Sequence, residues 1–571
     1  MCGYIYVERG AKHRELYDKL MQIRHRGPDN LACKILPGSD EGLGHVRLRI
    51  VDQAVGSDQP MCNDQYKLLY NGEIYNYKSI RAGMTREGVE FSTNSDTEVL
   101  FKSLIHYGVK STLAKVKGMY SFVFINQDDV FICRDEYGIK PVFYGWSEDH
   151  GLVVSTNSKS VSHLIGAAGR LRHEKLSQYF QYRCILPPDT IFEGVYSLPQ
   201  HNYGHWDKAE ASGLGSLKLQ PMASMEKPKV SGRYRSTFEG SVASLDAILR
   251  EVVAEQHQAS VPVAYLLSGG IDSSLLVAIS SDLGLCPSPI TFKRSSSDPD
   301  YNSAKAVANH LGLDLVEVED DGREDLTKWF SKSDQPTGCS SGMTSFLVFA
   351  KLRRLGFKVA ITGDGADEMF GGYKWLYKYL LSQDMLAWYS ENRKTDALKV
   401  VIKQIFRGFK AANYAAERYG LFKSDEIIRL VGQLDSDRFC SKQMTLREAL
   451  ESDLRDFLPL SLQRTDAASM AVSVEARVPY LDQRVVDFAK SLPDKFLIEN
   501  GVQKRVLRKL GEKYLPSDVL ERPKIGFTAD LSYFGGIGAK DQVIARLANW
   551  IVHNGLSIEN SELLGYGQTK S

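Results

Sequence analysis

The chain has 571 residues, of which 43% are hydrophobic and 25% are charged. These fractions are typical of a globular protein with two to four domains and exclude a disordered or fibrous chain. The 71 Lys and Arg residues balance 70 Asp and Glu residues, so the basic excess typical of nucleic-acid binding is missing.

The lack of targeting signals and the spacing of the cysteines restrict the class of protein further. No apolar run is long enough to predict a membrane span, and the first residues lack the pattern of a secretory signal. The eight cysteines are scattered and form no CxxC pair, which argues against a disulfide framework and a zinc site. We expect a cytoplasmic protein that binds neither nucleic acid nor membrane.

Short strands and turns alternate over residues 2–205, the first expected domain. The Asn71-Gly72 pair follows a strand and is typical of a turn, and a polar loop at 126–129 separates two strands that predict a β-hairpin. Hairpin strands with few helices indicate an α+β domain. The expected elements are strands at 66–70, 121–125 and 130–133, and helices near 12–24 and 95–108.

Residues 206–235 are rich in Gly, Ser, Lys and Pro and have no steady period, so we expect a linker there. Over the second expected domain, 236–571, short apolar runs alternate with helical stretches, which predicts a parallel sheet covered on both faces. Beyond about residue 373 the pattern is mostly helical. The expected elements are strands at 261–267, 288–292, 313–317 and 358–362, and helices at 237–258, from 272, at 302–311 and at 341–355.

The first motif that carries chemistry is Ser268-Gly269-Gly270-Ile271-Asp272-Ser273-Ser274, directly after a buried strand. The glycines let backbone N–H groups approach an anion, and the following helix adds partial positive charge. The serines can donate to phosphate, and Asp272 fits if Mg²⁺ bridges it to the phosphate. A Gly-Gly pair alone usually marks only a turn. The whole motif is more specific, and it lacks the lysine of a Walker A loop.

A second glycine-rich loop, residues 362–373, follows the strand at 358–362. It carries Asp364, Asp367 and Glu368 among four glycines. Because the C-terminal ends of parallel strands form one crevice, both loops can face one nucleotide, with Asp272 and Asp367 sharing Mg²⁺. Taken alone, the second loop is explained equally well as a turn with solvated acids.

Cys2 becomes the first residue when Met1 is removed, and its α-amine can then act as a base for its thiol. A cysteine at position 2 is weak evidence alone, but other motifs supply what an amidase site needs. They offer an arginine for a carboxylate, amide donors for an oxyanion and carboxylates for an ammonium: Arg47, Asn71-Gly72, Glu73 and Asp96. Together they suit the cleavage of an amino acid's side-chain amide.

In this order, the motifs resemble the glutamine-dependent asparagine synthetase family over nearly the whole chain. The resemblance implies an N-terminal-nucleophile glutaminase domain with an αββα sandwich, followed by an α/β ATP-pyrophosphatase synthetase domain with a helical C-terminal part. It also implies ATP and Mg²⁺ as cofactors, glutamine and aspartate as substrates, and often a homodimer. Further matching stretches lie at 118–122, 134–141, 473–482, 504–508 and 522–527.

The resemblance assigns roles in the glutaminase site. Cys2 would attack the glutamine amide and form a thioester, with an oxyanion hole made by Asn71 and the Gly72 N–H. Arg47 would grip the α-carboxylate of glutamine, and Glu73 and Asp96 would hold its α-ammonium. An internal channel would carry the released ammonia to the second site.

In the synthetase domain, the resemblance implies a β-aspartyl-AMP intermediate from which ammonia displaces AMP. Mg²⁺ on Asp272 and Asp367 would neutralise the departing pyrophosphate. Asp364 would deprotonate the amine, and Lys504 would stabilise charge on the adenylate. The ATP-binding residues implied are Leu266, Leu267, Ser268, Gly269, Gly270, Asp272, Ser273, Ser274, Arg294, Thr362 and Gly363.

Several positions depart from the family pattern and concern the acceptor and adenine pockets. Amidation of another carboxylate, such as a uronic acid sugar or a natural-product acid, therefore remains an alternative, with residues 334–345 expected near the acceptor. A relative that binds glutamine or ATP without turnover is a third possibility, against which the intact catalytic residues argue. The departures are Ala32, Thr156-Asn157, Arg294, Gln335, Thr362, Ala467 and Asp530.

Overall fold

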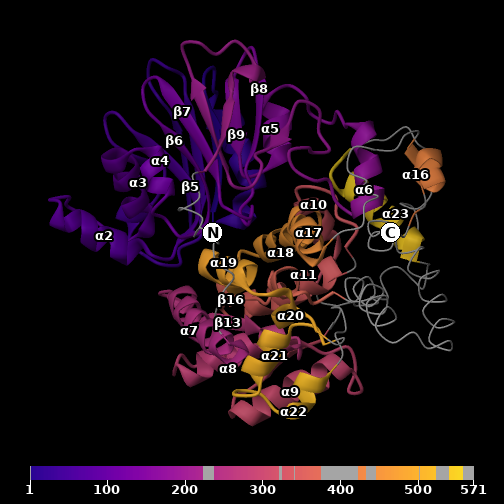
Figure 1. The fold of residues 1–571 in the computed structure, drawn as a ribbon. Helices are drawn as coiled ribbons and strands as arrows, with labels where there is room; N and C mark the ends of the chain where they lie inside the picture. The colour runs from indigo at the N-terminus through magenta and orange to yellow at the C-terminus, as the bar shows by residue number, and fades with distance from the viewer. Residues whose placement is uncertain are drawn as a thin grey trace.

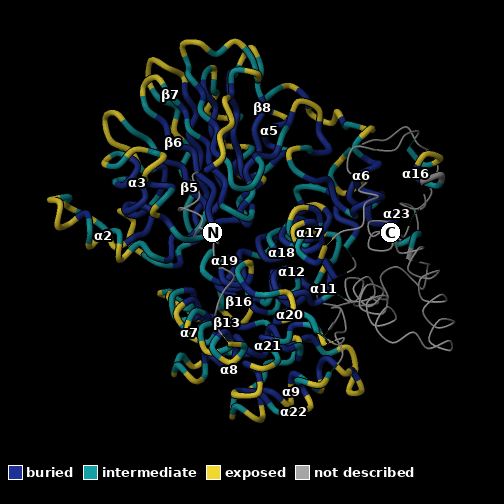
Figure 2. The backbone as a smooth tube through the Cα atoms, viewed as in Figure 1, coloured by how far each residue is buried: buried dark blue, intermediate teal, exposed yellow. Residues whose placement is uncertain are grey.

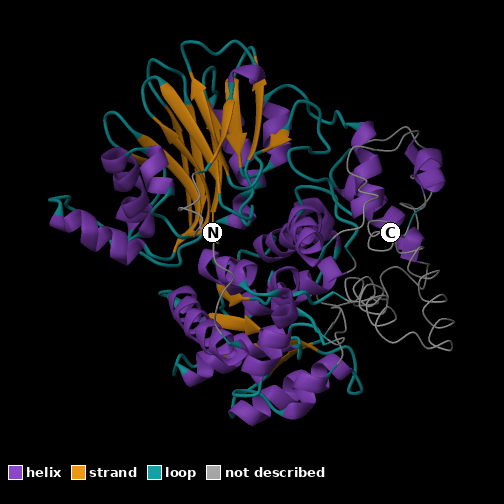
Figure 3. Cartoon of the chain, in the orientation of Figure 1, coloured by secondary structure: helices purple, strands orange, loops and turns teal. Residues whose placement is uncertain are grey.

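The computed structural model describes residues 2–222, 237–319, 324–339, 341–373, 422, 424–431, 445–499, 502–522 and 539–556. They form two lobes that lie against each other (Figure 1). The N-terminal lobe, within residues 2–222, is built around β-sheets, and the C-terminal lobe, from residue 237 onward, is mainly helical (Figure 3). None of the described helices combines the length and hydropathy needed to cross a bilayer.

The N-terminal lobe contains two six-stranded antiparallel sheets that pack face to face. In spatial order the first sheet comprises β10 (Tyr196–Ser197), β8 (Phe143–Ser147), β9 (Gly151–Ser155), β1 (Cys2–Val7), β3 (Gly42–Arg47) and β2 (Asn30–Ile35). The second comprises β12 (Lys218–Pro221), β11 (Asn202–Asp207), β7 (Asp129–Arg134), β6 (Gly118–Ile125), β5 (Lys67–Ile74) and β4 (Met61–Cys62).

Helices cover the outer faces of both sheets, which gives the four-layer αββα sandwich. On β1, side chains alternate: Tyr4 and Tyr6 enter the core between the sheets, whereas Ile5 and Val7 pack against Leu16 of α1. The predicted fold class of this domain is confirmed. The helices are α1 (His13–Gln22) and α5 (Ser158–Leu164) on the first sheet, α2 (Tyr77–Arg86), α3 (Asp96–Tyr107) and α4 (Val109–Leu113) on the side of the second, and α6 (Leu176–Tyr182), with 3₁₀ turns η1 (Arg24–Arg26), η2 (Val55–Ser57), η3 (His173–Lys175) and η4 (Leu214–Ser216).

Two local expectations differ from the structure of this lobe. The Asn71-Gly72 pair, predicted as a turn, lies inside β5 and pairs with β6, because sheet pairing overrides the local turn preference. A Cβ at Gly72 would come within 2.1 Å of the Met119 carbonyl oxygen, so the close approach of β6 requires glycine. In the segment expected as a linker, β12 pairs with β11, so the sheet extends beyond residue 205; residues 223–235 lie outside the described chain.

The C-terminal lobe contains a five-stranded parallel sheet with the order β15 (Val316–Val318), β14 (Ser288–Phe292), β13 (Val263–Leu266), β16 (Val359–Ile361) and β17 (Glu475–Arg477). The chain winds outward from β13 in one direction and then restarts from β16 on its other side. The adjacent pair β13 and β16 is therefore the topological switch point, where open α/β sheets bind ligands at the strand C-termini.

Helices cover both faces of this sheet. Val263 and Tyr265 of β13 belong to the cluster formed with α7 (Phe238–His257) and α8 (Ile271–Asp282), whereas Ala264 packs with α11 (Ser341–Arg354). The predicted parallel sheet with helices on both faces is confirmed. The remaining helices are α9 (Pro299–Leu311), α10 (Thr327–Lys332), α12 (Ala366–Phe370), α16 (Ser424–Val431), α17 (Leu446–Ser452), the π-helical turn η6 (Asp453–Phe457), α18 (Leu458–Met470), the 3₁₀ turn η7 (Pro479–Leu481), α19 (Gln483–Ser491), α20 (Asp494–Leu497), α21 (Arg505–Gly511), α22 (Ser517–Glu521) and α23 (Ala539–His553).

Strand β17 lies in the region beyond residue 373 that the sequence analysis expected to be mostly helical, and the sequence analysis did not predict it. Its three residues, Glu-Ala-Arg, contain no apolar run that would predict a strand. The strand is nevertheless wholly buried and hydrogen-bonded beside β16. In Figure 2 most strands of both lobes are dark blue, with exposed segments mainly at the periphery.

Candidate active sites

The first candidate site is a small pocket at the ends of β1, β3 and β5. Cys2, the first residue of β1, pairs in register with Arg47, the last residue of β3. The second sheet contributes Gly72 and Glu73 from β5, and α3 contributes Asp96 at its first turn. The fold thus brings the residues predicted for glutamine binding together around Cys2. One further wall residue, Glu475, comes from β17 of the C-terminal lobe.

Asn71 is oriented by the backbone of Cys2. Its Oδ1 accepts a hydrogen bond of 2.8 Å from the Cys2 nitrogen, which becomes the α-amine when Met1 is removed. Its Nδ2 is buried and has no partner among the described residues. Because buried polar atoms normally have partners, this amide suits a donor held ready for an oxyanion.

Arg47 is held rigidly at the opposite side of the pocket. Its guanidinium donates to Asp58 Oδ1 at 2.6 Å, to the Asp52 carbonyl at 2.7 Å and to the Ala54 carbonyl at 3.1 Å. Asp58 also binds Arg49 at 2.8 Å, so two guanidinium groups share one carboxylate. The fixed guanidinium of Arg47 in the pocket wall suits a substrate carboxylate.

The other side of the pocket is rich in carboxylates. Asp96 accepts hydrogen bonds from the Tyr70 hydroxyl at 2.8 Å and the Ile74 N–H at 3.1 Å, while burial raises its pKa. Burial and the neighbouring Asp96 raise the pKa of Glu73 well above its usual value, against the opposing effect of Arg477. Buried carboxylates that lack a full set of cations favour the binding of an ammonium group.

The second candidate site is a cavity of about 320 Å³ at the C-terminal ends of β13 and β16. The Ser268 N–H donates to Ser273 Oγ at 3.1 Å, which closes the first loop. Gly269 has a φ of +69°, and a Cβ there would lie 2.5 Å from the Asp300 carbonyl oxygen, so glycine is needed. Both predicted loops face this cavity, through Leu266, Leu267, Ser268, Asp272, Ser273, Thr362, Gly363, Asp364 and Asp367.

Lys504 lies between the two carboxylates predicted to bind Mg²⁺. Its Nζ is 2.8 and 2.6 Å from the two oxygens of Asp272 and also forms an ion pair with Asp367. A Cβ at Gly372 would overlap both Asp367 and Lys504, so glycine permits this approach. The carboxylates converge on one cation and offer only oxygen donors, which fits a divalent ion bound together with phosphate.

Asp364, predicted as a base, is a fully paired carboxylate in the structure. Its Oδ1 accepts from Arg464 at 2.7 Å and Ser461 at 2.8 Å, and its Oδ2 accepts from Thr362 at 2.9 Å and Thr465 at 3.0 Å. Three of these four donors belong to α18, so Asp364 ties the second glycine-rich loop to that helix.

Some predicted ATP-binding residues lie outside the walls of the cavity. Arg294 instead donates to Asp298 at 2.8 Å and to Asp300 at 3.3 Å, beside the helix α9 that supports the first loop. Ser274 is buried within α8. The structure therefore does not place the Arg294 side chain against the other ATP-site residues. The predicted ATP-binding residues outside the walls are Gly269, Gly270, Ser274 and Arg294, and Lys504, predicted to be catalytic, also lies outside them.

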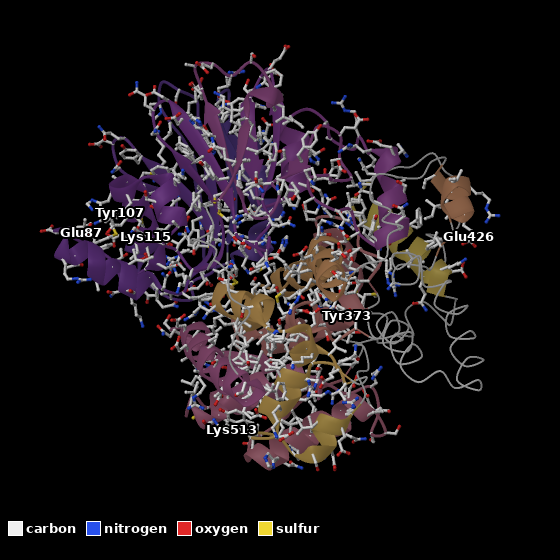
Figure 4. All side chains as sticks on the ribbon, in the orientation of Figure 1. Glu87, Tyr107, Lys115, Tyr373, Glu426 and Lys513 are labelled. Carbon is white, nitrogen blue, oxygen red and sulfur yellow. The ribbon has the colours of Figure 1, made fainter. Side chains whose placement is uncertain are left out.

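Sequence reasoning missed several residues of this cavity. Arg464 holds Asp364, and Cys339 lies 3.1 Å from Ser341 Oγ. Burial raises the pKa of the Cys339 thiol, but Arg464 and Ser341 lower it more, so the net shift is downward. Tyr373, labelled among the helices of the C-terminal lobe in Figure 4, donates to Glu368 at 2.6 Å. The resemblance led us to expect residues 334–345 near the acceptor, and Cys339 and Ser341 line this cavity, but no sequence signal identified Arg464.

A third cavity, of about 60 Å³, lies between the lobes. Arg26 lines it, donates to the Cys2 carbonyl at 3.3 Å and pairs with Asp466 at 2.9 Å. Asp466 lies two residues from Arg464, which reaches the second site. The interface cavity therefore shares Arg26 with the surroundings of Cys2 and is lined by residues of α18, the helix that carries Arg464.

Fold and sites define a glutamine amidotransferase domain joined to a synthetase domain built for an adenine nucleotide. Residues 1–216 match the family model described as a glutamine amidotransferase domain, and residues 244–560 match the model described as asparagine synthase. The chain belongs to the asparagine synthase family and is an enzyme, a carbon–nitrogen ligase.

Named relatives extend over nearly the whole chain. The chain is 27% identical to Asparagine synthetase [glutamine-hydrolyzing] 1 of Bacillus subtilis (strain 168), covering 94% of this chain and 88% of the relative. It is 26% identical to Asparagine synthetase [glutamine-hydrolyzing] 3 of the same organism, with coverages of 92% and 86%. It is also 26% identical to Amidase chry2 of Gibberella zeae, with coverages of 91% and 86%.

Proposed function

We propose that the enzyme amidates aspartate to asparagine, with glutamine as nitrogen donor, and converts ATP to AMP and pyrophosphate. The observation that carries this proposal is the presence of two complementary sites in one chain, with a cavity at the interface of the two lobes. One pocket has a thiol, a positive side and a negative side, as hydrolysis of an amino-acid amide requires. The other has the glycine-rich loops and paired carboxylates of a nucleotide site.

In the glutaminase half, Cys2 Sγ attacks the amide carbon of glutamine, and the C–N bond breaks to release ammonia. Arg47 binds the α-carboxylate, while Glu73 and Asp96 face the α-ammonium. Asn71 Nδ2 and the Gly72 N–H stabilise the oxyanion. Water then hydrolyses the thioester to glutamate and restores Cys2.

Asn71→Ala is expected to slow glutamine hydrolysis by about 10²–10³-fold, because one oxyanion donor contributes about 2.7–4 kcal/mol to the transition state. The loss should appear in kcat more than in KM, since Asn71 contacts the reacting oxygen and not the amino-acid end. Steady-state glutamate release measures both constants. A change confined to KM would contradict the oxyanion role.

In the synthetase half, the aspartate side-chain carboxylate attacks the α-phosphorus of ATP. Asp272 and Asp367 would hold Mg²⁺, which neutralises charge on the departing pyrophosphate. Lys504 lies between these two carboxylates, and its ammonium neutralises part of the negative charge of the phosphates. Arg464, held by Asp364, supplies a fixed guanidinium for a carboxylate of the acceptor. Ammonia then attacks the acyl-adenylate and AMP leaves.

The ammonia reaches the second site through the interface, in our proposal, because ammonia released to water at neutral pH would be mostly protonated. The cavity lined by Arg26 and Asp466 is the described part of that route. A homodimer and a cytoplasmic location are further proposals that rest on the family resemblance alone.

The acceptor is tested by incubating the protein with ATP, Mg²⁺ and glutamine, with and without aspartate. We expect aspartate-dependent AMP in equal amount to asparagine. Because one relative of similar identity is named an amidase, the second candidate is the same chemistry on another carboxylate. Glutamate release without aspartate-dependent AMP would support that candidate. A folded protein with N-terminal Cys2 that forms neither glutamate nor AMP would contradict both.

A further inference from the structure

The backbone of Cys2 is held at both of its ends by side chains. Its nitrogen donates to Asn71 Oδ1 at 2.8 Å, and its carbonyl oxygen accepts a hydrogen bond of 3.3 Å from Arg26 Nε. When Met1 is removed, Cys2 becomes the end of the chain, and a single peptide bond joins it to the rest of the protein. The contacts of its nitrogen and carbonyl therefore help to fix the direction of its thiol.

Arg26, of the turn η1, is itself held by a carboxylate. Its Nη1 donates to Asp466 Oδ2 at 2.9 Å and its Nη2 donates to Asp466 Oδ1 at 3.3 Å. These two bonds form a bidentate pair, which sets the plane of the guanidinium. Because the guanidinium is rigid and planar, fixing two of its nitrogens also fixes the direction of the Nε–H bond toward the Cys2 carbonyl.

Asp466 belongs to the other lobe, where it lies on α18. The side chains of Arg26 and Asp466 are only 7% and 12% exposed, and a buried charge needs a partner of opposite sign. Over the part of the chain that the structure describes, Arg26 is the only hydrogen-bond or ion-pair partner of the Asp466 carboxylate. This carboxylate therefore serves Arg26 and not a network within the synthetase lobe.

The helix that carries Asp466 is fixed on two sides. Three donors of α18 hold Asp364 of the second glycine-rich loop. Just after the helix, Ser473 Oγ donates to the His25 carbonyl at 2.5 Å, and His25 is the neighbour of Arg26 in η1. The position of Asp466 relative to Arg26 is therefore set by contacts of α18 with both the nucleotide loop and η1.

We propose that Asp466 is a positioning residue for the glutaminase reaction, through which the synthetase lobe orients the nucleophile of the other lobe. Asp466 fixes Arg26, and Arg26 fixes the carbonyl of Cys2. The inference rests on the proposed glutaminase reaction and extends it to a residue outside the pocket. Neither Arg26 nor Asp466 lines the Cys2 pocket, so the effect on glutamine passes through the position of Cys2 alone.

A purely structural ion pair between the lobes would behave differently from a positioning residue. Its loss would lower the thermal midpoint, and each molecule that stayed folded would turn over at the wild-type rate. Loss of a positioning residue instead lowers kcat in folded protein, because the reacting atoms are no longer held in the productive geometry. It leaves KM nearly unchanged, because the groups that would bind the amino-acid end of glutamine are not touched.

Asp466→Asn tests the proposal with little change of shape. The asparagine amide has one acceptor and one donor group, so one N–H of Arg26 would face another donor and the bidentate pair is lost. We expect kcat for glutamate release to fall about tenfold or more, with KM within about twofold of wild type. Asp466→Glu keeps a carboxylate and should recover a large part of kcat. All rates are measured below the thermal midpoint of each variant.

Asp189→Asn is the matched control, because Asp189 lines the same interface cavity but pairs with Arg172 and Lys175 of the glutaminase lobe. It removes a carboxylate from the cavity without touching Arg26, so kcat should stay at the wild-type value. A double-mutant cycle then tests the route of the effect. In an Arg26→Gln background, Asp466→Asn should cause no further loss of kcat, because the contact through which Asp466 acts is already broken.

Three results would overturn the inference: a wild-type kcat in folded Asp466→Asn, a change confined to KM, or equal losses of kcat with Arg26 and with Arg26→Gln. AMP formation with ammonium chloride is measured on the same preparations and should be unchanged in Asp466→Asn. A parallel fall there would assign the loss to a displaced α18 and would also overturn it. The proposed function fails by a different result, namely no release of glutamate from glutamine by the wild-type protein.

Discussion

Cys2→Ala is expected to abolish glutamine-dependent AMP and product formation and to leave the reaction with added ammonium salt in place. The thiol of Cys2 is the nucleophile we propose for the first pocket, and loss of a covalent nucleophile slows catalysis by roughly 10⁴-fold or more. The second cavity lies in the other lobe and takes no side chain from β1. AMP and glutamate measured in parallel, with glutamine or with ammonium chloride, give the result.

Cys133→Ala is a suitable control for this prediction, because Cys133 is also a buried cysteine but belongs to the hydrophobic core behind the second sheet. It removes a sulfur without touching either site, so both nitrogen sources should still support the reaction. If Cys2→Ala lost the ammonia-dependent reaction as well, while remaining folded, the division of labour between two sites would be refuted.

The sequence predicts those parts of the sites that depend on short motifs within one segment of the chain. The loops at 268–274 and 362–373 combine a preceding apolar strand with glycines, and the parallel arrangement then places both at one edge of the sheet. The structure brings them to the same cavity for that reason. Asp272 and Asp367 line it, and Lys504 meets them beside it, because each of the three residues lies at the start of a helix.

Long-range pairing decides the parts that the sequence did not reveal. Arg464 of α18 pairs with Asp364, which lies 100 residues earlier in the chain. No local sequence pattern predicts such a pair. Glu475 enters the Cys2 pocket across the boundary between the lobes, because β17 adds to the edge of the parallel sheet beside β16. In the same way, the turn preference of Asn71-Gly72 yields to pairing between β5 and β6.

Asp364 and Asp272 show what the structure adds to the sequence. Both are acidic residues in glycine-rich loops, and the resemblance assigns Asp272 to Mg²⁺ and Asp364 to a base. Asp364 accepts four hydrogen bonds from one arginine and three hydroxyl groups, which fix Arg464 beside it. Asp272 instead pairs with the buried ammonium of Lys504, which also pairs with Asp367.

Asp272→Ala is expected to reduce pyrophosphate and AMP formation by at least about 10²-fold, the effect of removing one fixed charge-stabilising group from a reacting phosphate. Glutamine hydrolysis should continue, because the Cys2 pocket takes no residue from α8. Removal of Asp272 also leaves Lys504 with Asp367 as its remaining carboxylate partner, so the thermal midpoint must be measured alongside activity.

Asp282→Ala is the matched control for this change, since Asp282 ends the same helix α8 and pairs with Arg250 at the surface. It should leave both half-reactions near the wild-type rate. Radiolabelled pyrophosphate exchange into ATP isolates the adenylation step from ammonia supply. Unchanged exchange in Asp272→Ala would exclude Asp272 from the phosphate site. The ion pair between Asp272 and Lys504 would then have a purely structural role, because Asp272 would take no part in holding the nucleotide.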